Sequence, residues 1–258
     1  MLYIDLNCDM GENFGVYSLG NDEEIMPYVT SINVACGFHA SDPANMRKTV
    51  KLAKKYGVAV GAHPSLPDLV GFGRRAMSVT PDEIKADFIY QIGALQAFCH
   101  AEGVVMQHVK DHGAITDMAN NDLAIAIAMA EAIQAVDSSL YMVCLANSLM
   151  VKAAKTVGIP YVEEAYADRA YTDTGSLVSR KQANAIIHDA ATVRKRVLGM
   201  MKEKQILSIN GSVLPIDAQT ICLHGDTPGA IALAKELRAS LESSGVTVQP
   251  FGKSLRSD

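Results

Sequence analysis

The chain has 258 residues, of which 49% are hydrophobic and 20% are charged, so it holds enough apolar material for a large core. Its 23 basic and 28 acidic residues give a net charge of -5, which provides no broad basic surface for nucleic acid. The absence of Trp and an aromatic content of 6% also argue against a surface for base stacking. Small polar ligands are therefore the expected partners.

Neither a membrane segment nor a disulfide framework is predicted. No apolar run approaches the ~18 residues that a membrane helix requires. The first strand begins at Leu2, without the basic region and cleavage site of a signal peptide. The five cysteines form no CxxC pair and no close cluster. We expect a cytoplasmic protein with reduced and mostly buried thiols.

Short β-rich runs alternate with longer amphipathic runs along the whole chain. This alternation is typical of a mainly parallel sheet whose strands are joined by helices. The predicted strands are residues 2–8, 31–36, 57–63, 104–109, 140–145, 161–165 and 220–224. The predicted helices are residues 42–55, 81–101, 122–135, 147–157, 190–203 and 227–243. Two of these helices have clear start signals, Asp42 before Pro43 and Thr80 before Pro81.

No linker or shift in composition divides the chain. Because β/α barrels of ~250 residues form one domain, we predict the α/β class and a single seven-stranded (β/α) barrel over residues 1–258. An open, doubly wound sheet is the alternative. The polar tail, residues 252–258, is expected to fray.

Polar side chains follow one face of the first predicted strand. Asp5, Asn7 and Asp9 alternate with apolar residues, and side chains two residues apart share a face. Strands of a parallel barrel are usually apolar on both faces. The stripe therefore predicts either a functional site at the end of the strand or a buried hydrogen-bond network that fixes the register. Glu12 follows in a loop at the expected rim.

Five of the seven histidines lie at the carboxyl ends of other predicted strands. A single histidine in such a place is as often structural as catalytic, but five are harder to explain that way. The active sites of β/α barrel enzymes form at this face, so we expect these strand ends to meet. The polar residues there are Asn33, His39, His63, His108, Lys110, His112, His224 and Asp226.

This set of residue types favours hydrolysis of an amide or ester. Carboxylates beside histidines can orient a base that acts on water, and a lysine among them can have a shifted pKa. A divalent metal is possible but not favoured, because His108 and His112 have extended spacing with Lys110 between them. The sequence has neither a GxSxG motif nor a P-loop. We expect this chain to bind no cofactor.

Six separated motifs carry these residues. They are Ile4-Asp5-Leu6-Asn7-Cys8-Asp9-Met10-Gly11-Glu12, Asn33-Val34-Ala35-Cys36-Gly37-Phe38-His39-Ala40, Gly61-Ala62-His63-Pro64-Ser65, His108-Val109-Lys110, Ala167-Asp168-Arg169 and Cys222-Leu223-His224-Gly225-Asp226. In this order, from about residue 4 to residue 248, the chain resembles the bacterial LamB/YcsF lactam-utilisation family.

The resemblance implies a seven-stranded barrel like those of glycoside hydrolases and polysaccharide deacetylases, and a role in the ATP-dependent opening of 5-oxoproline to glutamate. It also implies two partner subunits of 5-oxoprolinase, B and C, which use ATP to phosphorylate the lactam. This chain would then hydrolyse the activated lactam, which has a better leaving group than the free amide. The missing P-loop agrees with this division of labour.

The resemblance and the side-chain chemistry together imply a role for each residue. The catalytic set has Asp9 and Glu12 as acid/base candidates, His63 to position water, and Lys110 to meet developing negative charge. The substrate-binding set is Asn7, Asn33, His39, His108, His112, Arg169, His224 and Asp226.

The chain departs from the family pattern at three positions near the expected site. Asp111 replaces a proline directly after Lys110, Thr116 replaces an aromatic residue, and Ser179 replaces a second proline. Asp111 adds a negative charge that would weaken binding of an anionic substrate. Substrate identity is therefore more open than the fold.

Two other functions remain open at this point. One is a metal-dependent amidase or deacetylase on the same barrel. The other is a ligand-binding or assembly subunit that has lost activity through the changes at Asp111 and Thr116. Association with copies of itself is also possible.

Overall fold

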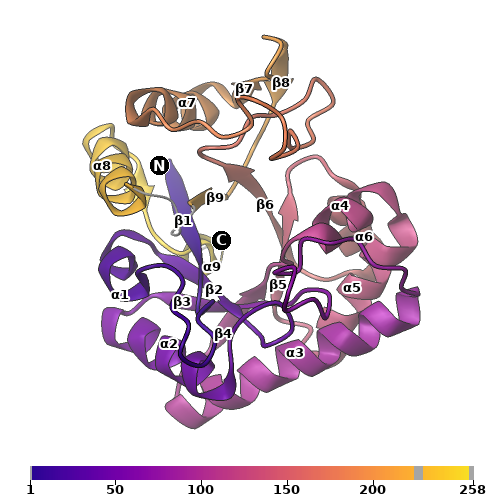
Figure 1. Cartoon of the computed structure of the whole chain (residues 1–258). Helices are drawn as coiled ribbons and strands as arrows, with labels where there is room; N and C mark the ends of the chain where they lie inside the picture. Colours follow the sequence, from indigo (N-terminus) through magenta and orange to yellow (C-terminus); the bar gives the residue numbers. More distant parts are fainter. Residues whose placement is uncertain (1, 224–228, 256–258) are drawn as a thin grey trace.

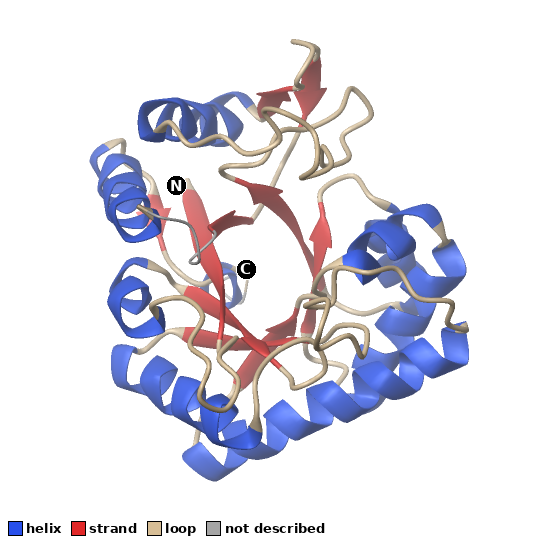
Figure 2. Cartoon of the chain, in the orientation of Figure 1, coloured by secondary structure: helices blue, strands red, loops and turns tan. Residues whose placement is uncertain are grey.

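The structure is a computed structural model that describes residues 2–223 and 229–255. In this part of the chain, seven parallel strands form a closed barrel (Figures 1 and 2). They pair in the order β1-β2-β3-β4-β5-β6-β9, and β9 pairs with β1 to complete the ring. The strands are β1 Tyr3–Met10, β2 Ser31–Ala35, β3 Ala59–His63, β4 Met106–Val109, β5 Tyr141–Leu145, β6 Tyr161–Tyr166 and β9 Thr220–Leu223. The predicted barrel is confirmed, and the open sheet is excluded.

Helices surround the barrel, and each predicted helix is present (Figure 2). The described helices are α1 Asp22–Ile25, η1 Met26–Tyr28, α2 Pro43–Tyr56, α3 Pro81–Glu102, α4 Ala114–Asn121, α5 Leu123–Val136, α6 Leu149–Val157, α7 Ala190–Glu203, α8 Ala230–Ser243 and α9 Phe251–Ser254. The start signals are confirmed: the Asp42 side chain accepts hydrogen bonds from two backbone N–H groups of α2, and Thr80 forms a capping box with Glu83. Within the described residues, no helix combines the length and apolarity needed to cross a bilayer.

Three short strands were not predicted. β7 Gln205–Leu207 and β8 Val213–Pro215 form an antiparallel hairpin outside the barrel. β10 Thr247–Val248 pairs with the first residues of β1, at the amino-terminal end of the barrel. The chain therefore returns to its own beginning after α8.

The prediction that the tail frays from Gly252 is wrong as far as the described residues extend. Phe251 and Gly252 are buried in α9, and the Phe251 ring lies 5.4 Å from the rings of both His108 and Tyr141. Figure 1 shows α9 behind the barrel opening. The polar composition of residues 252–258 gave no indication of this anchor, which Phe251 provides just before the tail and to which Leu255 adds an apolar contact. Residues 256–258 lie outside the described part.

Polar side chains fill much of the barrel interior. Ile4, Leu6 and Cys8 of β1 belong to the main apolar core, whereas the Asp5 carboxylate accepts hydrogen bonds from hydroxyl groups. Those hydroxyls belong to Thr30, Ser31 and Thr220. This lower level of the polar stripe is therefore a buried network that joins β1, β2 and β9, one of the two expected alternatives.

Gly61 in β3 makes room for the His108 ring inside the barrel. A Cβ at this position would lie 2.2 Å from two atoms of that ring.

We expect Gly61→Ala to lower the free energy of unfolding by about 1–3 kcal/mol, because the ring must move into an already packed interior. Urea unfolding measures the change. Gly93→Ala is the matched control in α3, where a Cβ meets open space, and it should stabilise by about 1 kcal/mol. Equal stability of Gly61→Ala and the wild type would contradict this account.

Candidate active site

A cavity of about 900 Å³ opens beyond the carboxyl ends of the strands. Its wall is built from the ends of β1, β3, β4 and β6, from loops that carry residues 74–76, 111–113 and 176–181, and from one face of α4. The predicted site residues that line it are Asp9, Glu12, His63, Lys110, His112 and Arg169. His224 and Asp226 lie outside the described residues.

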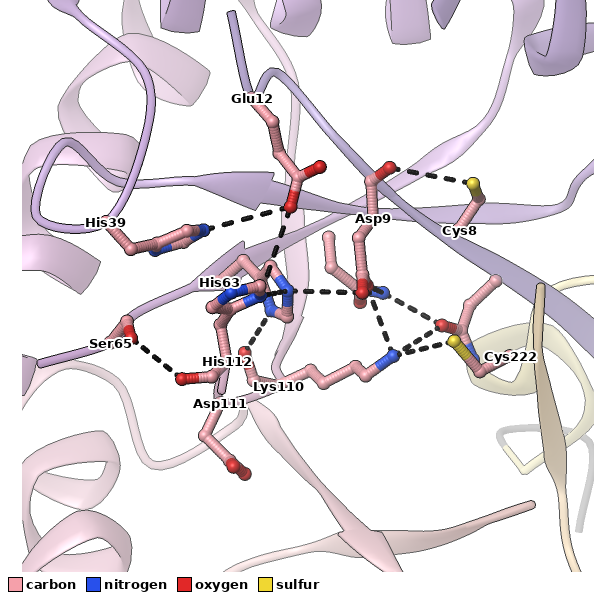
Figure 3. Close-up of polar contacts among 12 residues, drawn as sticks. Cys8, Asp9, Glu12, His39, His63, Ser65, Lys110, Asp111, His112 and Cys222 are labelled. Carbon is pink, nitrogen blue, oxygen red and sulfur yellow. Dashed lines mark hydrogen bonds and ion pairs between the residues drawn. The ribbon is translucent and has the colours of Figure 1, made fainter. Parts of the chain in front are cut away.

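Lys110 extends across the barrel from the end of β4. Its Nζ lies 3.1 Å from both Asp9 Oδ1 and Cys222 Sγ (Figure 3). It also lies 2.9 Å from Glu164 Oε1. Burial alone would lower the pKa of Lys110, but the charges of Asp9 and Glu164 outweigh it and hold this pKa well above its usual value. Lys110 is therefore an ammonium ion that faces the cavity.

Asp9 lies between Lys110 and His63 at the end of β1. Its Oδ1 also accepts a hydrogen bond of 2.8 Å from Asn33, and its Oδ2 lies 3.4 Å from His63 Nε2. Burial favours protonation, but the neighbouring His63 and Lys110 hold the pKa of Asp9 well below its usual value. The same contact raises the pKa of His63, although burial acts in the opposite direction. An ionised carboxylate thus adjoins an ammonium ion at the cavity surface.

Three residues predicted to bind substrate lie beneath the cavity and do not line it: Asn7, Asn33 and His108. His108 Nε2 donates to Asn33 Oδ1 at 2.7 Å, and the Asn33 amide donates to Asn7 Oδ1 at 2.8 Å. Burial and the charge of Lys110 lower the pKa of His108 to about 3, so its ring is neutral. Since the same Asn33 amide also bonds Asp9, this chain of hydrogen bonds fixes the position of the Asp9 carboxylate.

Glu12, His39, His63 and His112 form a second group beside Asp9, which we call the Glu–His cluster. Each offers one ligand atom, and these four atoms all lie within 4.8 Å of one another. The His39 and His112 rings stack at 3.9 Å, and Phe72 of the loop after β3 packs edge-on against both. His39 is buried behind the other three and does not line the cavity.

The imidazoles of His39 and His112 are neutral. Burial, with further effects from nearby histidines, lowers the pKa of His112 to about 3 and places the pKa of His39 well below its usual value. Neutral imidazoles with a carboxylate can ligate a metal ion. The objection raised from the sequence concerned the pair His108 and His112, whereas the structure separates His108 from this cluster.

Cationic side chains surround the cavity mouth. Arg74, Arg169, Arg180 and Lys181 all line the cavity, and the Arg169 guanidinium donates a 2.7 Å hydrogen bond to the Val178 carbonyl. Sequence reasoning identified Arg169 and missed the other three, which lie in loops without periodic pattern. An anionic ligand would meet several positive charges on entering.

Glu164 and Tyr166 are two further residues that sequence reasoning missed. Glu164 pairs with Lys110 from inside β6, and the Tyr166 ring lies 5.4 Å from Lys110 Nζ. A carboxylate within a predicted apolar strand is the same signal that marked Asp5, so the sequence did contain an indication of Glu164.

The departures from the family pattern at Asp111 and Thr116 contact each other. The Thr116 hydroxyl donates to the Asp111 carboxylate, and burial raises the pKa of Asp111 to about 6. Both residues line the cavity, as does Ser179 at its exposed edge. The substitutions therefore alter the wall of the candidate site rather than a distant surface.

Comparisons with known proteins place the chain in one family. The family model described as the LamB/YcsF family matches residues 4–256. The A subunit of 5-oxoprolinase from Clostridium beijerinckii is 51% identical over 253 residues, which is 98% of this chain and 99% of the relative. The protein of the same name from Geobacillus thermodenitrificans is 50% identical over 256 residues, 99% of this chain and 100% of the relative.

A solved structure shows the same arrangement over nearly the whole length. The lactam utilization protein from Thermus thermophilus superposes with a TM-score of 0.92 at 43% identity, covering 96% of this chain and 99% of that chain. The chain belongs to the LamB/YcsF family.

Proposed function

We propose that this chain is the hydrolytic subunit of an ATP-dependent 5-oxoprolinase and converts a phosphorylated 5-oxoproline to L-glutamate together with partner subunits B and C. The names of its relatives support this assignment. The observation that carries it is the pairing of Asp9 with Lys110 on the surface of a cavity whose mouth is cationic. A carboxylate and an ammonium ion so placed suit the addition of water to an activated amide carbon.

The charge of the cavity mouth suits the proposed substrate. A phosphorylated 5-oxoproline has a carboxylate and a phosphoryl group, both of which form strong charge-assisted hydrogen bonds with arginine. Arg74, Arg169 and Arg180 supply three guanidinium groups. In this arrangement they hold the anionic groups at the mouth while the ring carbon approaches Asp9 and Lys110.

The proposed reaction consumes two water molecules. Asp9 accepts a proton as the first water adds to the ring carbon that bears the phosphoryl oxygen, and Lys110 faces the negative charge that develops there. The ring carbon–nitrogen bond then breaks, the nitrogen takes up the proton held by Asp9 and the proton released by the new hydroxyl group, and an acyl phosphate remains. The second water displaces phosphate from this acyl group and leaves glutamate.

ATP is assigned to the partner subunits in this proposal, because the sequence has no P-loop. We also place the reaction in the cytoplasm. All five cysteines are buried and unpaired, as is typical of proteins from a reducing compartment.

A metal-dependent amidase is a second candidate function, which the Glu–His cluster favours. The two candidates differ in what the isolated chain can do. An amidase of this kind would act with a metal alone, whereas the proposed subunit requires an activated lactam.

Reconstitution tests the need for activation. We expect no glutamate from 5-oxoproline with the isolated chain, because an unactivated lactam resists hydrolysis, and steady release when subunits B, C and ATP are all present. Glutamate is measured with each component omitted in turn. Turnover by the isolated chain without ATP would contradict the proposal, and an inactive complete mixture would favour another substrate or a non-catalytic role.

Asp9→Asn tests the proton acceptor. The substitution keeps the shape of the side chain but removes its basicity, so we expect the rate of the reconstituted complex to fall by about 10²- to 10⁴-fold. Asp217→Asn is the control, since this exposed carboxylate pairs with Lys204 on the surface. Thermal unfolding of both variants separates lost chemistry from lost structure. A wild-type rate for Asp9→Asn would transfer the role to Glu12.

Arg180→Ala tests the cationic mouth. Arg180 is exposed at the cavity edge, so its removal should leave the fold intact and raise the KM for the substrate by up to about tenfold through the loss of a charge-assisted contact. The effect should shrink at high salt, because salt screens exposed charges. Lys195→Ala removes an exposed charge from α7 and serves as the control. An unchanged KM for Arg180→Ala would argue against substrate binding at this edge.

A further inference from the structure

Backbone carbonyls fix the protons on two histidines of the Glu–His cluster. His63 Nδ1 lies 2.7 Å from the Lys110 carbonyl oxygen, and His112 Nε2 lies 3.0 Å from the Phe72 carbonyl oxygen. A carbonyl oxygen only accepts, so each of these ring nitrogens must donate. In a neutral ring the other nitrogen then has a free lone pair. Those nitrogens are His63 Nε2 and His112 Nδ1.

The two lone pairs face each other at a distance of 3.1 Å. Two neutral rings in these tautomers have no proton to share across that contact, so it needs either a bound metal ion or an additional proton on His63, whose pKa Asp9 raises. Glu12 Oε1 lies 3.9 Å from both His112 Nδ1 and His39 Nε2. Ligands of a tetrahedral zinc ion lie about 3.3 Å apart when each bond is about 2.0 Å long. The 3.1 Å between the two histidine nitrogens is slightly shorter than this ligand spacing, and the 3.9 Å from Glu12 to each histidine is slightly longer.

His39 supplies an independent observation. Its side chain is 1% exposed, and neither ring nitrogen has a hydrogen-bond partner within the described part of the chain. A buried ring nitrogen without a partner costs free energy, and native proteins rarely leave one unsatisfied. Its Nε2 lies on the side of Glu12, 3.9 Å from Oε1. A cation bound at the cluster would satisfy it.

We propose that Glu12, His39, His63 and His112 bind one divalent cation of the zinc type. Three imidazole nitrogens and one carboxylate suit zinc and related first-row ions, whereas magnesium and calcium prefer oxygen ligands. The carbonyl groups that orient His63 and His112 are the second layer of contacts that metal-binding histidines usually have. Figure 3 shows the four side chains pointing toward one another. Glu12, His63 and His112 line the cavity, so an ion bound by them faces it.

The proposal adds a cation to the site without depending on the reaction assigned above. Asp9 Oδ2 lies 3.4 Å from His63 Nε2, so a water molecule held by the ion would lie next to the proposed proton acceptor. Only this consequence rests on the proposed function. A proton held between His63 and His112 is the competing explanation of their contact, and metal analysis distinguishes the two.

The first test measures metal binding by the full-length wild-type chain, without partner subunits, ATP or lactam. The protein is stripped with a chelator and titrated with Zn²⁺ and with Co²⁺. We expect one tightly bound ion per chain, visible absorption bands of low-symmetry cobalt, and imidazole scattering in the X-ray absorption spectrum. A folded wild-type chain that binds neither ion stoichiometrically, or binds one without imidazole ligands, would overturn the proposal. The contact between His63 and His112 would then be explained by a proton shared between them.

The second test identifies the ligands. His39→Gln and His112→Gln should each weaken binding by at least about tenfold, since even the loss of an outer contact has an effect of that size. They should also abolish the rise in Tm that the ion gives the wild type. His100→Gln, exposed on α3 and remote from the barrel interior, is the control and should bind like the wild type. Unchanged binding by both cluster variants would refute the site.

The two tests keep this proposal apart from the proposed function. If a cluster variant misfolds, the absorption spectrum of the wild-type chain still decides whether imidazoles bind the ion. Metal binding without lactam opening in the reconstituted complex would count against the assigned reaction alone. Lactam opening by a chain that binds no ion would count against the metal site alone.

Discussion

The Lys110 ammonium group, buried inside the barrel, is the constraint on which the arrangement of the site depends. A buried charge is tolerated only when opposite charges and hydrogen bonds surround it, and removal of one partner is strongly destabilising. Lys110 satisfies this condition through Asp9 of β1 and Glu164 of β6, two strands that it reaches across the barrel. The requirement for neutralisation thus fixes three strands relative to one another and holds Asp9 at the surface of the cavity.

Below Lys110, hydrogen bonds between buried side chains continue this fixed arrangement toward the base of the barrel. Asn7 donates to Glu164 and to Thr220, while Asn33 connects Asn7 with His108. Nearly every side chain in this column has its partners within the barrel, so rotation of any one would leave a buried polar atom unsatisfied. The column therefore acts as a rigid support for the groups at the cavity, as efficient positioning of reacting atoms requires.

Much of the fold could be predicted from the sequence, because period-two alternation and helix-capping signals depend only on neighbouring residues. The strands, the main helices and the polar face of β1 follow from such patterns. Alternation indicates the face of a strand but not the height of a residue within a barrel. Asn7, Asn33 and His108 were therefore assigned to substrate, although they lie beneath the cavity.

Residues in loops were the second limit of prediction. Glu12 lies two residues beyond β1 and His39 four residues beyond β2, so no periodicity could indicate that His39 packs on His112 or that Glu12 lies beside both. Phe251 shows the same limit at the other end of the barrel, where its burial beside Tyr141 determines the path of a largely polar segment. Tertiary contacts of this kind depend on where the preceding element ends.

Closure of the barrel between β1 and β9 also has a consequence for biosynthesis. The hydrogen bond between Asn7 and Thr220 joins residues 213 positions apart. At ribosomal rates of about 5–20 residues per second, the edge of β1 that pairs with β9 waits roughly 10–40 s for its neighbour to be synthesised. During that time the open edge and the buried charges of β1 are exposed in the nascent chain, a state in which unpaired strand edges favour aggregation. With this topology, β1 therefore needs protection from aggregation during translation until β9 has been synthesised.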